Sequence, residues 1–537
     1  MNKTASGKTI DAAIVGAGFA GMYSIYRLRS MGLEVHAFEA ASDVGGTWWW
    51  NCYPGSRCDV ESLDYCYAFD EALLDEWHWS ERFATQPEVL RYAKHVADRY
   101  GLRDHITFNA RVNSCVWDED EHLWTVSTES GETVRARFLI AASGCLSKPH
   151  RPDLPGVDDF AGRVLFTQAW PHEGVELAGK RVGVIGTGSS GIQSIPVIAR
   201  EAAHLTVFQR TANFTLPAVN RPVDPAYEAE IRADYLGHRR EILQNKAATV
   251  KQTLAESAFD FSDAEREAAY EAKWQRGGAG GIPIVFADSL TNPASNKEAA
   301  KFVWRKISEI VDDPETAESL TPRDHPIATK RICLDTDYYA TFNRANVTLV
   351  DLKKTPIERV TAGGIETSAG SHPLDVLVFA TGFDAMTGPL RAMNVRGTGG
   401  VKIDEAWADG PRTYLGLMVA GFPNLFTITG PGSPSVLVNM IAAIEQHVDW
   451  IARLVGRMRD AGETRVEASE AAQEDWVDEV RRVADTTLYP LANSWYNGDN
   501  IAGKPRMFMA YVGGYPAYAA RCEEIAAAGY PGFEMSA

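Results

Sequence analysis

Two glycine-rich hexapeptides are the residues of this chain whose type and spacing point most directly to chemistry. The first comprises Gly16, Ala17, Gly18, Phe19, Ala20 and Gly21, and the second comprises Gly186, Thr187, Gly188, Ser189, Ser190 and Gly191. In each, the first glycine permits a tight turn, the second lets the backbone approach a pyrophosphate, and the third allows close helix–strand packing. A helix that begins there points its backbone N–H groups at the phosphates. The chain is therefore predicted to bind two dinucleotides, with a merely structural turn as the alternative.

The residue that ends the strand after each turn distinguishes the two sites. Glu39 stands 23 positions after the first glycine of its turn, and Gln209 stands at the same offset of 23 in the second unit, followed by Arg210 and Thr211. An acid can hold ribose hydroxyls, whereas a cation can pair with a 2′-phosphate that an acid would repel. We therefore expect FAD at the first turn and NADPH, rather than NADH, at the second. A solvated arginine at a strand end is the alternative interpretation of Arg210.

The elements that must position these residues follow from hydrophobic periodicity. Residues 10–39 and 180–210 each read as strand, glycine turn, helix and strand, which is a βαβ unit. Charged segments with helical spacing lie after the second of these units and before the later apolar strands NVTLVDL and LDVLVFATGF. The predicted fold is α/β, with two Rossmann-like dinucleotide-binding domains and a helical insertion in the NADPH domain. The predicted boundaries are 1–146 and 383–537 for the FAD domain, 147–213 and 326–382 for the NADPH domain, and 214–325 for the insertion.

Bulk composition excludes several classes of partner. A chain of 537 residues is too long for one compact core. The net charge of −18 argues against nucleic acid or an anionic membrane as a partner, because both need a basic face. The sequence contains no apolar stretch of the roughly 20 residues that a membrane span requires. Seven cysteines, an odd and sparse set, favour a reducing cytoplasmic location, and no metal-binding motif is present.

A longer motif after Glu39 narrows the chemistry. Residues 45–59 read GGTWWWNCYPGSRCD, which closely resembles the pattern G-G-x-W, four residues, Y-P-G, three residues, D of type I Baeyer–Villiger monooxygenases. Residues 84–91, 330–331, 379–384, 430–435 and 494–504 resemble the same family, nearest to its phenylacetone and steroid monooxygenase branch. The resemblance covers nearly the whole chain. It implies an enzyme that uses FAD, NADPH and O2 to convert ketones to esters or lactones through a flavin C4a-peroxide.

The resemblance also assigns roles to single residues. Arg331 matches the family's catalytic arginine, and Asp59 matches the aspartate beside it. A permanently cationic donor suits a reaction that develops an oxyanion. Lys330 is implied to join Arg210 at the 2′-phosphate, and Trp495 matches a tryptophan that folds over bound NADP. Without the resemblance, Arg331 would be interpreted as a surface arginine, Asp59 as a turn aspartate and Trp495 as a core tryptophan.

The complete set of expected site residues is as follows. The FAD site is expected to comprise Gly16, Gly18, Phe19, Ala20, Gly21, Glu39, Gly46, Thr47, Trp48, Asp59, Tyr65, Val112 and Met440. The NADP site is expected to comprise Arg57, Gly186, Thr187, Gly188, Ser189, Ser190, Gly191, Arg210, Thr211, Lys330, Arg331 and Trp495. Ser435, Val436, Leu437 and Met440 are expected to line the substrate pocket.

Two positions depart from the family pattern. The family fingerprint is F-x-G, three residues, H, three residues, W-P, and here residues 160–171 match it except that Phe166 replaces the histidine. That histidine lies on a linker between the cofactor domains, so its loss bears on domain coupling, although packing in a strand is the simpler interpretation of Phe166. Cys145 occupies a position near the flavin where the family leads us to expect glutamine.

Three other functions remain open at this stage. A flavin monooxygenase that oxidises nitrogen or sulfur shares both glycine turns. A disulfide reductase needs two cysteines separated by four residues just after the Gly-Gly-Thr turn, whereas five residues separate Cys52 and Cys58, which argues against this function. A non-catalytic flavoprotein that senses NADPH would give no reason for Arg331 and Asp59. The expected partners are a small ketone and O2, and the expected assembly is a monomer or weak homo-oligomer.

Overall fold

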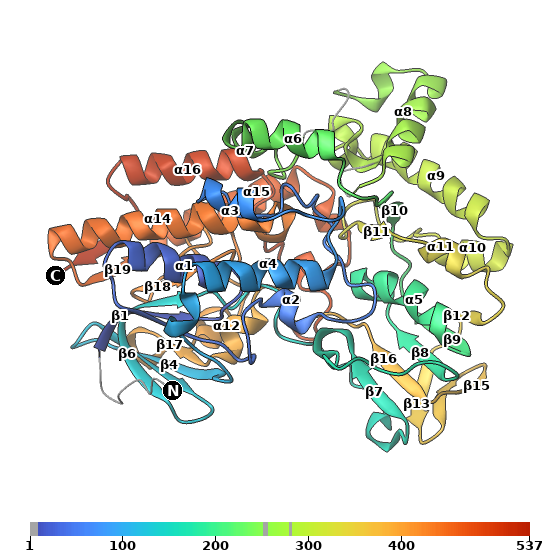
Figure 1. The fold of residues 1–537 in the computed structure, drawn as a ribbon, viewed down its shortest axis with the longest axis horizontal. Coiled ribbons are helices and arrows are strands. Elements are labelled where there is room, and N and C mark those ends of the chain that lie inside the picture. The colour runs from blue at the N-terminus through green and yellow to red at the C-terminus, as the bar shows by residue number, and fades with distance from the viewer. Residues whose placement is uncertain (1–8, 251–255, 279–281) are drawn as a thin grey trace.

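The chain folds into two α/β lobes, each built on a sheet with parallel strands. The computed structural model describes residues 9–250, 256–278 and 282–537. Figure 1 shows the first and last parts of the chain side by side in one lobe and the middle of the chain in the other. The predicted α/β fold with two Rossmann-like units is confirmed.

The first lobe contains an eight-stranded sheet. Its order is β17 (Val395–Arg396), β4 (Val112–Asp118), β5 (Leu123–Thr128), β6 (Thr133–Ala141), β1 (Thr9–Val15), β2 (Val35–Phe38) and β3 (Ile106–Thr107), with β18 (Leu425–Thr427) also paired to β6. The apolar strand β1 lies parallel to β2 and β6. Because β18 pairs with the end of β6, the C-terminal part of the chain completes a sheet that the N-terminal part begins.

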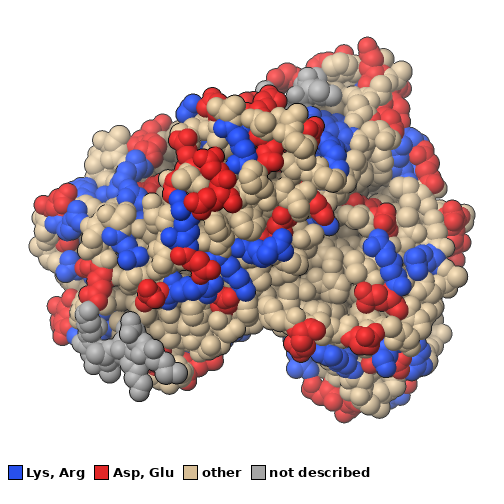
Figure 2. Space-filling view, in the orientation of Figure 1, with Lys and Arg blue, Asp and Glu red and all other residues tan. Residues whose placement is uncertain are grey.

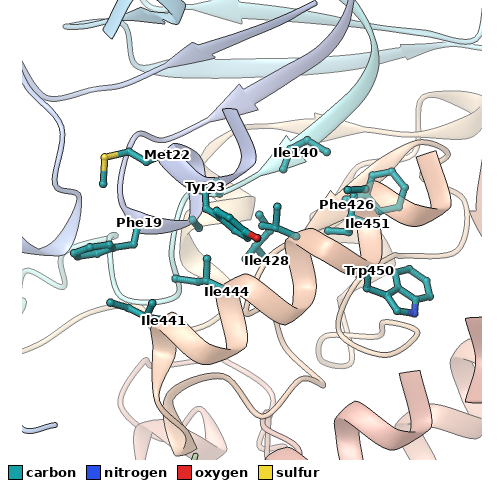
Figure 3. Close-up of a cluster of buried hydrophobic side chains, with 14 of the residues drawn as sticks. Phe19, Met22, Tyr23, Ile140, Phe426, Ile428, Ile441, Ile444, Trp450 and Ile451 are labelled. Carbon is teal, nitrogen blue, oxygen red and sulfur yellow. The ribbon is translucent and has the colours of Figure 1, made fainter. Parts of the chain in front are cut away.

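One long helix supplies much of the core of this lobe. Helix α14 (Met440–Ala461) packs against α1 (Phe19–Ser30), which follows the first glycine turn. Figure 3 shows Ile441, Ile444 and Ile451 of α14 among side chains of α1, β6 and β18. These side chains are almost fully buried. Burial of aliphatic side chains stabilises by roughly 1.5–3 kcal/mol each, so this contact holds α1 and its glycine turn in place.

The second lobe contains a five-stranded, all-parallel sheet. Its order is β12 (Val347–Asp351), β9 (His204–Gln209), β8 (Arg181–Ile185), β16 (Val376–Phe379) and β7 (Arg163–Phe166). Helix α5 (Ser189–Glu201) follows the second glycine turn between β8 and β9. Strand β16 is buried throughout, and β8 and β9 are buried except at their first residues, as expected for a parallel sheet covered on both faces.

The helices within 214–325 divide between the two lobes. Helices α6 (Pro225–Ala233) and α7 (Tyr235–Leu243) bury Ile231 and Tyr235 in the core of the first lobe. Arg239 of α7 also donates to Glu445 of α14 at 2.5 Å. Helices α8 (Asp263–Arg276), α9 (Pro293–Ile310) and α10 (Pro314–Leu320) contribute instead to the core of the second lobe. Figure 1 shows α6 and α7 lying over the first lobe, apart from α8 to α10.

The remaining elements complete the lobes. They are α2 (Thr47–Trp50), α3 (Glu71–Glu76), α4 (Gln86–Arg99), α11 (Tyr338–Thr341), α12 (Gly388–Ala392), α13 (Ile403–Ala406), α15 (Glu470–Asp485) and α16 (Tyr515–Ala527), and the strand pairs β10 (Thr215–Pro217) with β11 (Cys333–Asp335), β13 (Ile357–Thr361) with β14 (Gly364–Thr367) and β15 (Gly370–Pro373), and β19 (Arg465–Ala468) with β20 (Phe533–Ser536). On the face in Figure 2, acidic and basic side chains are interspersed. Among the described residues, no helix is both long and apolar enough to cross a membrane.

Candidate active site

The first glycine turn has the geometry that its sequence predicts. Gly16 has φ of +101°, and a Cβ there would lie 2.7 Å from the carbonyl oxygen of Ala142. A Cβ on Gly21 would lie 1.9 Å from the carbonyl oxygen of Gly16. Helix α1 begins at Phe19, so its free N–H groups open onto this turn. Gly18 faces Gly46, which brings the turn against the loop that precedes α2.

Glu39 is fastened to the turn by its carboxylate. Its two oxygens accept the backbone N–H of Ala17 at 2.6 Å and that of Ala41 at 2.7 Å. Burial raises the pKa of this carboxyl, while these hydrogen bonds oppose the rise. Because a carboxylate offers about four acceptor positions, Glu39 can hold the turn and still accept from ribose hydroxyls.

The second glycine turn repeats this geometry. Gly186 has φ of +109°, and a Cβ there would lie 2.5 Å from the carbonyl oxygen of Ala380. A Cβ on Gly191 would lie 2.2 Å from the carbonyl oxygen of Gly186, whereas one on Gly188 would meet nothing within 4 Å. The turn therefore leaves open space beside the N-terminus of α5. Thr187 ties the turn to the next strand by donating to the carbonyl of Thr211 at 2.9 Å.

Gln209 and Arg210, at the end of the strand after the second turn, differ in burial. Gln209 is buried and donates to the carbonyl of Ser319 at 2.6 Å, while Arg210 is exposed. A pocket at the ends of β9 and β12 is lined by Arg210 and by three further cations, which are Arg323, Lys353 and Lys354. Sequence reasoning missed these three, although the Lys-Lys pair directly after a strand was a usable signal.

Two cations near this pocket form no ion pair with a carboxylate of the described residues. Arg323 pairs with Glu318, and Lys353 pairs with Asp324. Within the described part of the chain, neither Arg210 nor Lys330 has an ion-pair partner. Burial lowers the pKa of Lys330, the charge of Asp324 opposes that shift, and the charge of Arg210 adds to it. Two mutually repelling cations without ion-pair partners form a place that an anion stabilises.

Arg331 joins three segments that are far apart in sequence. Its Nε and Nη2 donate to the same Asp59 oxygen, Oδ2, at 3.0 and 2.6 Å, and its Nη1 donates to the carbonyl of Val436 at 2.6 Å. The carboxylate of Asp59 raises the pKa of Arg331 further above its ordinary value. The side chains of Arg331 and Asp59 remain 32% and 25% exposed. The guanidinium of Arg331 is therefore a permanently charged, oriented donor that another molecule can still reach.

The segment with Trp495 lies against this pair. The rings of Trp495 and Tyr496 are 4.2 Å apart, and the hydroxyl of Tyr496 contacts the Arg331 guanidinium. Burial raises the pKa of Tyr496 to about 12, so the hydroxyl keeps its proton near neutral pH. Lys504 fastens the segment to the linker after β16 by donating to Asp384 at 2.8 Å and to the carbonyl of Ala385 at 2.6 Å. Sequence reasoning missed Tyr496, because a second aromatic residue beside Trp495 carries no signal of its own.

An apolar cluster adjoins Arg331 and contains three of the four expected substrate residues. Val436, Leu437 and Met440 pack there with Cys145. The cluster also contains Leu290, Met386, Tyr489, Tyr496 and Phe508. Ser435 is fully buried with φ of +46°. The structure thus brings residues from both halves of the first lobe, and Leu290 from the segment 214–325, to one place.

Some of the other residues expected at the cofactor sites lie beside the first glycine turn, and others have different contacts. Trp48 donates to the hydroxyl of Tyr65 at 3.1 Å, and the ring of Tyr65 lies 5.9 Å from that of Phe19, so these three form one wall beside the first turn. Arg57 instead pairs with Glu81 and donates to the carbonyl of Phe83 at 2.7 Å. Val112 is buried in a separate core on the sheet. The cofactor contacts assigned to Arg57 and Val112 stay predictions.

Phe166 packs as an ordinary apolar residue at the end of β7. Its ring stacks on that of Phe379 with centroids 5.1 Å apart and an interplanar angle of 18°.

The two lobes contact each other where Tyr53 and Gly55 meet helix α5. Gly55 lies so close to α5 that a Cβ would come within 2.2 Å of the carbonyl oxygen of Gln193, and Tyr53 donates to the side chain of Gln193 at 2.7 Å.

Known proteins resemble this chain over nearly its whole length. Residues 8–245 match the family model for flavin-binding monooxygenase-like proteins. A Baeyer–Villiger monooxygenase of Pseudooceanicola batsensis is 44% identical over 532 residues, which are 98% of this chain and 97% of that protein. A phenazine N-monooxygenase of Lysobacter antibioticus is 42% identical, over 97% of this chain and 96% of the relative. A solved structure of oxidised steroid monooxygenase bound to NADP superposes with a TM-score of 0.94 at 50% identity, covering 98% of this chain and 100% of the other.

Proposed function

The chain belongs to the Baeyer–Villiger monooxygenase family, and we propose that it converts an apolar ketone to an ester or lactone. The reaction consumes one ketone, one O2, one NADPH and one proton, and it yields ester, NADP+ and water. FAD and NADPH are the cofactors of this class of enzyme. The oriented Arg331 cation beside an apolar cluster is the observation that carries the proposal.

The residues of both glycine turns fit the two cofactors. At each turn, glycines stand where a Cβ would collide with backbone, and a helix N-terminus opens onto the turn. Such a place accommodates a pyrophosphate. We assign FAD to the turn at Gly16–Gly21 with Glu39, and NADPH to the turn at Gly186–Gly191. Arg210 and Lys330 would neutralise the 2′-phosphate, because neither cation forms an ion pair among the described residues.

The role of Arg331 follows from its charge and its fixed direction. Bound flavin, reduced by NADPH, supplies the chemistry that activates O2. The attacked carbonyl oxygen then acquires negative charge, and an oriented cationic donor stabilises that charge more than it stabilises the neutral ketone. Asp59 and the Val436 carbonyl hold three N–H groups of Arg331, and the Tyr496 hydroxyl and the substrate share the two remaining donors.

The apolar cluster supports an apolar substrate. Val436, Leu437 and Met440 offer no charged group, and we propose that they contact the ketone body together with Cys145. A buried charge on the substrate would be costly there, because nothing apolar can replace its hydration. The domain boundaries, the cytoplasmic location and the monomeric or weakly oligomeric state stay predictions.

Product analysis under 18O2 tests the proposal. Purified protein would be supplied with NADPH and a panel of aliphatic, cyclic and aryl ketones, with an alkyl aryl sulfide and a phenazine as competing probes. We expect ester or lactone that carries one labelled oxygen atom. Labelled N-oxide without any ester would favour nitrogen oxidation instead, the activity that the name of the Lysobacter relative describes.

An arginine variant separates the role of Arg331 from general loss of charge. Arg331→Ala is expected to retain FAD and abolish ester formation, whereas Arg359→Ala, at an exposed hairpin pair with Glu366, should behave as the wild-type protein. Ester formation by Arg331→Ala at the wild-type rate would overturn the assignment.

A further inference from the structure

The loop between β18 and α14 holds two residues in a disfavoured backbone conformation. Thr429 has φ of +53° and Ser435 has φ of +46°. Both are buried, with 2% and 0% of their surface exposed. A residue with a Cβ persists in the left-handed region only where surrounding contacts impose it. The contacts that impose it here therefore decide where the backbone of residues 429–436 lies.

Thr429 is held by a histidine that no part of the proposed reaction uses. His447 lies on α14, two turns after Met440, and is completely buried. Its Nδ1 accepts the backbone N–H of Thr429 at 3.0 Å. Burial lowers the pKa of His447 to about 3, so the ring stays neutral near neutral pH. Because Nδ1 accepts, the proton resides on Nε2.

Two hydrogen bonds and the peptide link between Ser435 and Val436 connect Thr429 to Arg331. The hydroxyl of Ser435 donates to the carbonyl of Thr429 at 2.8 Å. The next residue, Val436, accepts from Nη1 of Arg331 through its carbonyl at 2.6 Å. A shift of Thr429 would therefore move Ser435, and with it the Val436 carbonyl, which is one of the acceptors that orient the guanidinium. The remaining contacts, to a single oxygen of Asp59 and to the Tyr496 hydroxyl, would then orient the guanidinium less completely.

We propose that His447 is a positioning residue of the oxygenation site, which fixes Thr429 and Ser435 and thereby the Val436 carbonyl that orients Arg331. This inference rests on the proposed function, since it concerns how well the Arg331 cation serves ketone oxidation. His447 itself contacts none of the reacting atoms.

Two substitutions separate hydrogen bonding from filling of space. His447→Leu fills the buried site but removes the acceptor. His447→Asn places a side-chain oxygen near the position of Nδ1 and can restore the hydrogen bond to Thr429. A misplacement of catalytic groups by about 1 Å can cost on the order of a hundredfold in rate. We expect His447→Leu to lower the rate of ester formation roughly tenfold to a hundredfold and to raise the NADPH consumed per ester. His447→Asn should recover most of both losses.

Amide hydrogen exchange supplies a readout that needs no turnover. The peptide that contains Thr429 should exchange faster in His447→Leu than in the wild-type protein, and His447→Asn should return it toward the wild-type rate. Anaerobic reduction of the flavin by NADPH should be unchanged in both variants. Trp450→Phe is the matched control. Trp450 lies on the same helix, and the substitution removes a buried hydrogen bond to the carbonyl of Cys522, which lies outside the loop between β18 and α14.

A double-variant comparison tests the path. His447→Leu and Ser435→Ala act on one series of contacts. The combined variant should therefore be only slightly less active than the less active of the two single variants. Fully additive losses would contradict the path. The proposal would also be overturned if His447→Leu kept the wild-type yield of ester per NADPH, if His447→Asn were no better, or if Trp450→Phe lost as much.

The two levels of inference fail in distinguishable ways. A wild-type protein that forms no ester from any ketone refutes the proposed function and this inference with it. A wild-type protein that forms ester, together with a His447→Leu variant that does so equally well, refutes only the role of His447.

Discussion

Replacing Asp59 by asparagine isolates the charge that orients Arg331. The substitution keeps the size and one acceptor oxygen of the side chain, while it removes the negative charge that both Arg331 donors meet at 3.0 and 2.6 Å. Hydrogen bonds to charged groups contribute about 1.5–3 kcal/mol and neutral ones about 0.5–1.5 kcal/mol. Each of the two bonds should therefore lose about 1 kcal/mol.

Solvent reduces that loss. The Arg331 and Asp59 side chains are 32% and 25% exposed, so water screens part of their attraction. We expect a total loss of about 1–2 kcal/mol of transition-state stabilisation. At about 1.4 kcal/mol per factor of ten, this corresponds to a rate of ester formation roughly 5- to 30-fold lower.

The assay compares two steps in one preparation. Stopped-flow absorbance under anaerobic conditions gives the rate of flavin reduction by NADPH, which Asp59→Asn should change little. Mass spectrometry gives ester formed per NADPH, which should fall. Glu366→Gln, which neutralises an exposed acid paired with Arg359, is the control and should leave both measurements unchanged.

Two results would refute the reasoning. Asp59→Asn could form ester at the wild-type rate and yield, which would show that the charge of Asp59 does not matter for Arg331. Glu366→Gln could lose as much activity as Asp59→Asn, which would show that the loss reflects a general change in charge.

Three further predictions follow from the same structure. Arg210→Ala should raise the KM for NADPH roughly tenfold or more and leave that for NADH nearly unchanged, since one charge-assisted contact to the 2′-phosphate is lost; an unchanged ratio of the two KM values would contradict the assignment. Gly55→Ala should lower the thermal unfolding midpoint by several degrees more than Gly174→Ala, because both glycines have φ of +81° but only the Cβ at position 55 would collide, at 2.2 Å from the carbonyl oxygen of Gln193; equal shifts would show that backbone strain alone matters. Burial raises the pKa of Asp335 from 3.8 to about 6, so the folded state binds more protons than the unfolded state between these values, and stability falls as pH rises through this window. Asp335→Asn should remove roughly 3 kcal/mol of that fall, measured by urea unfolding below and above the window, and an unchanged difference would refute the role of this group.

Local sequence was sufficient to predict both dinucleotide turns. The backbone has positive φ at Gly16 and Gly186, and it approaches other backbone so closely at Gly21 and Gly191 that a Cβ would collide. These requirements depend on residues within a few positions of each other, so a short motif encodes them. The contrast between Glu39 and Arg210 is equally local, since each residue directly follows the strand that comes after its own turn.

The division of the helical segment was not predictable in this way. Residues 214–325 have one continuous helical pattern, yet α6 and α7 pack on the first lobe and α8 to α10 on the second. Amphipathic spacing shows that a helix has an apolar face, but it does not identify the surface that covers that face.

The arrangement around Arg331 depends on tertiary structure for the same reason. Asp59 is 272 positions and Val436 is 105 positions away in the chain, and nothing in the local sequence of any of the three pairs them. The resemblance to a family supplied Arg331 and Asp59, but it supplied neither the Val436 carbonyl nor Tyr496, nor the buried histidine behind them. The sequence by itself determined which backbone turns form and which charge ends each strand, because adjacent residues fix those features. Only the tertiary structure decided which side chains compensate one another's charge, because that depends on segments that meet after the lobes have folded.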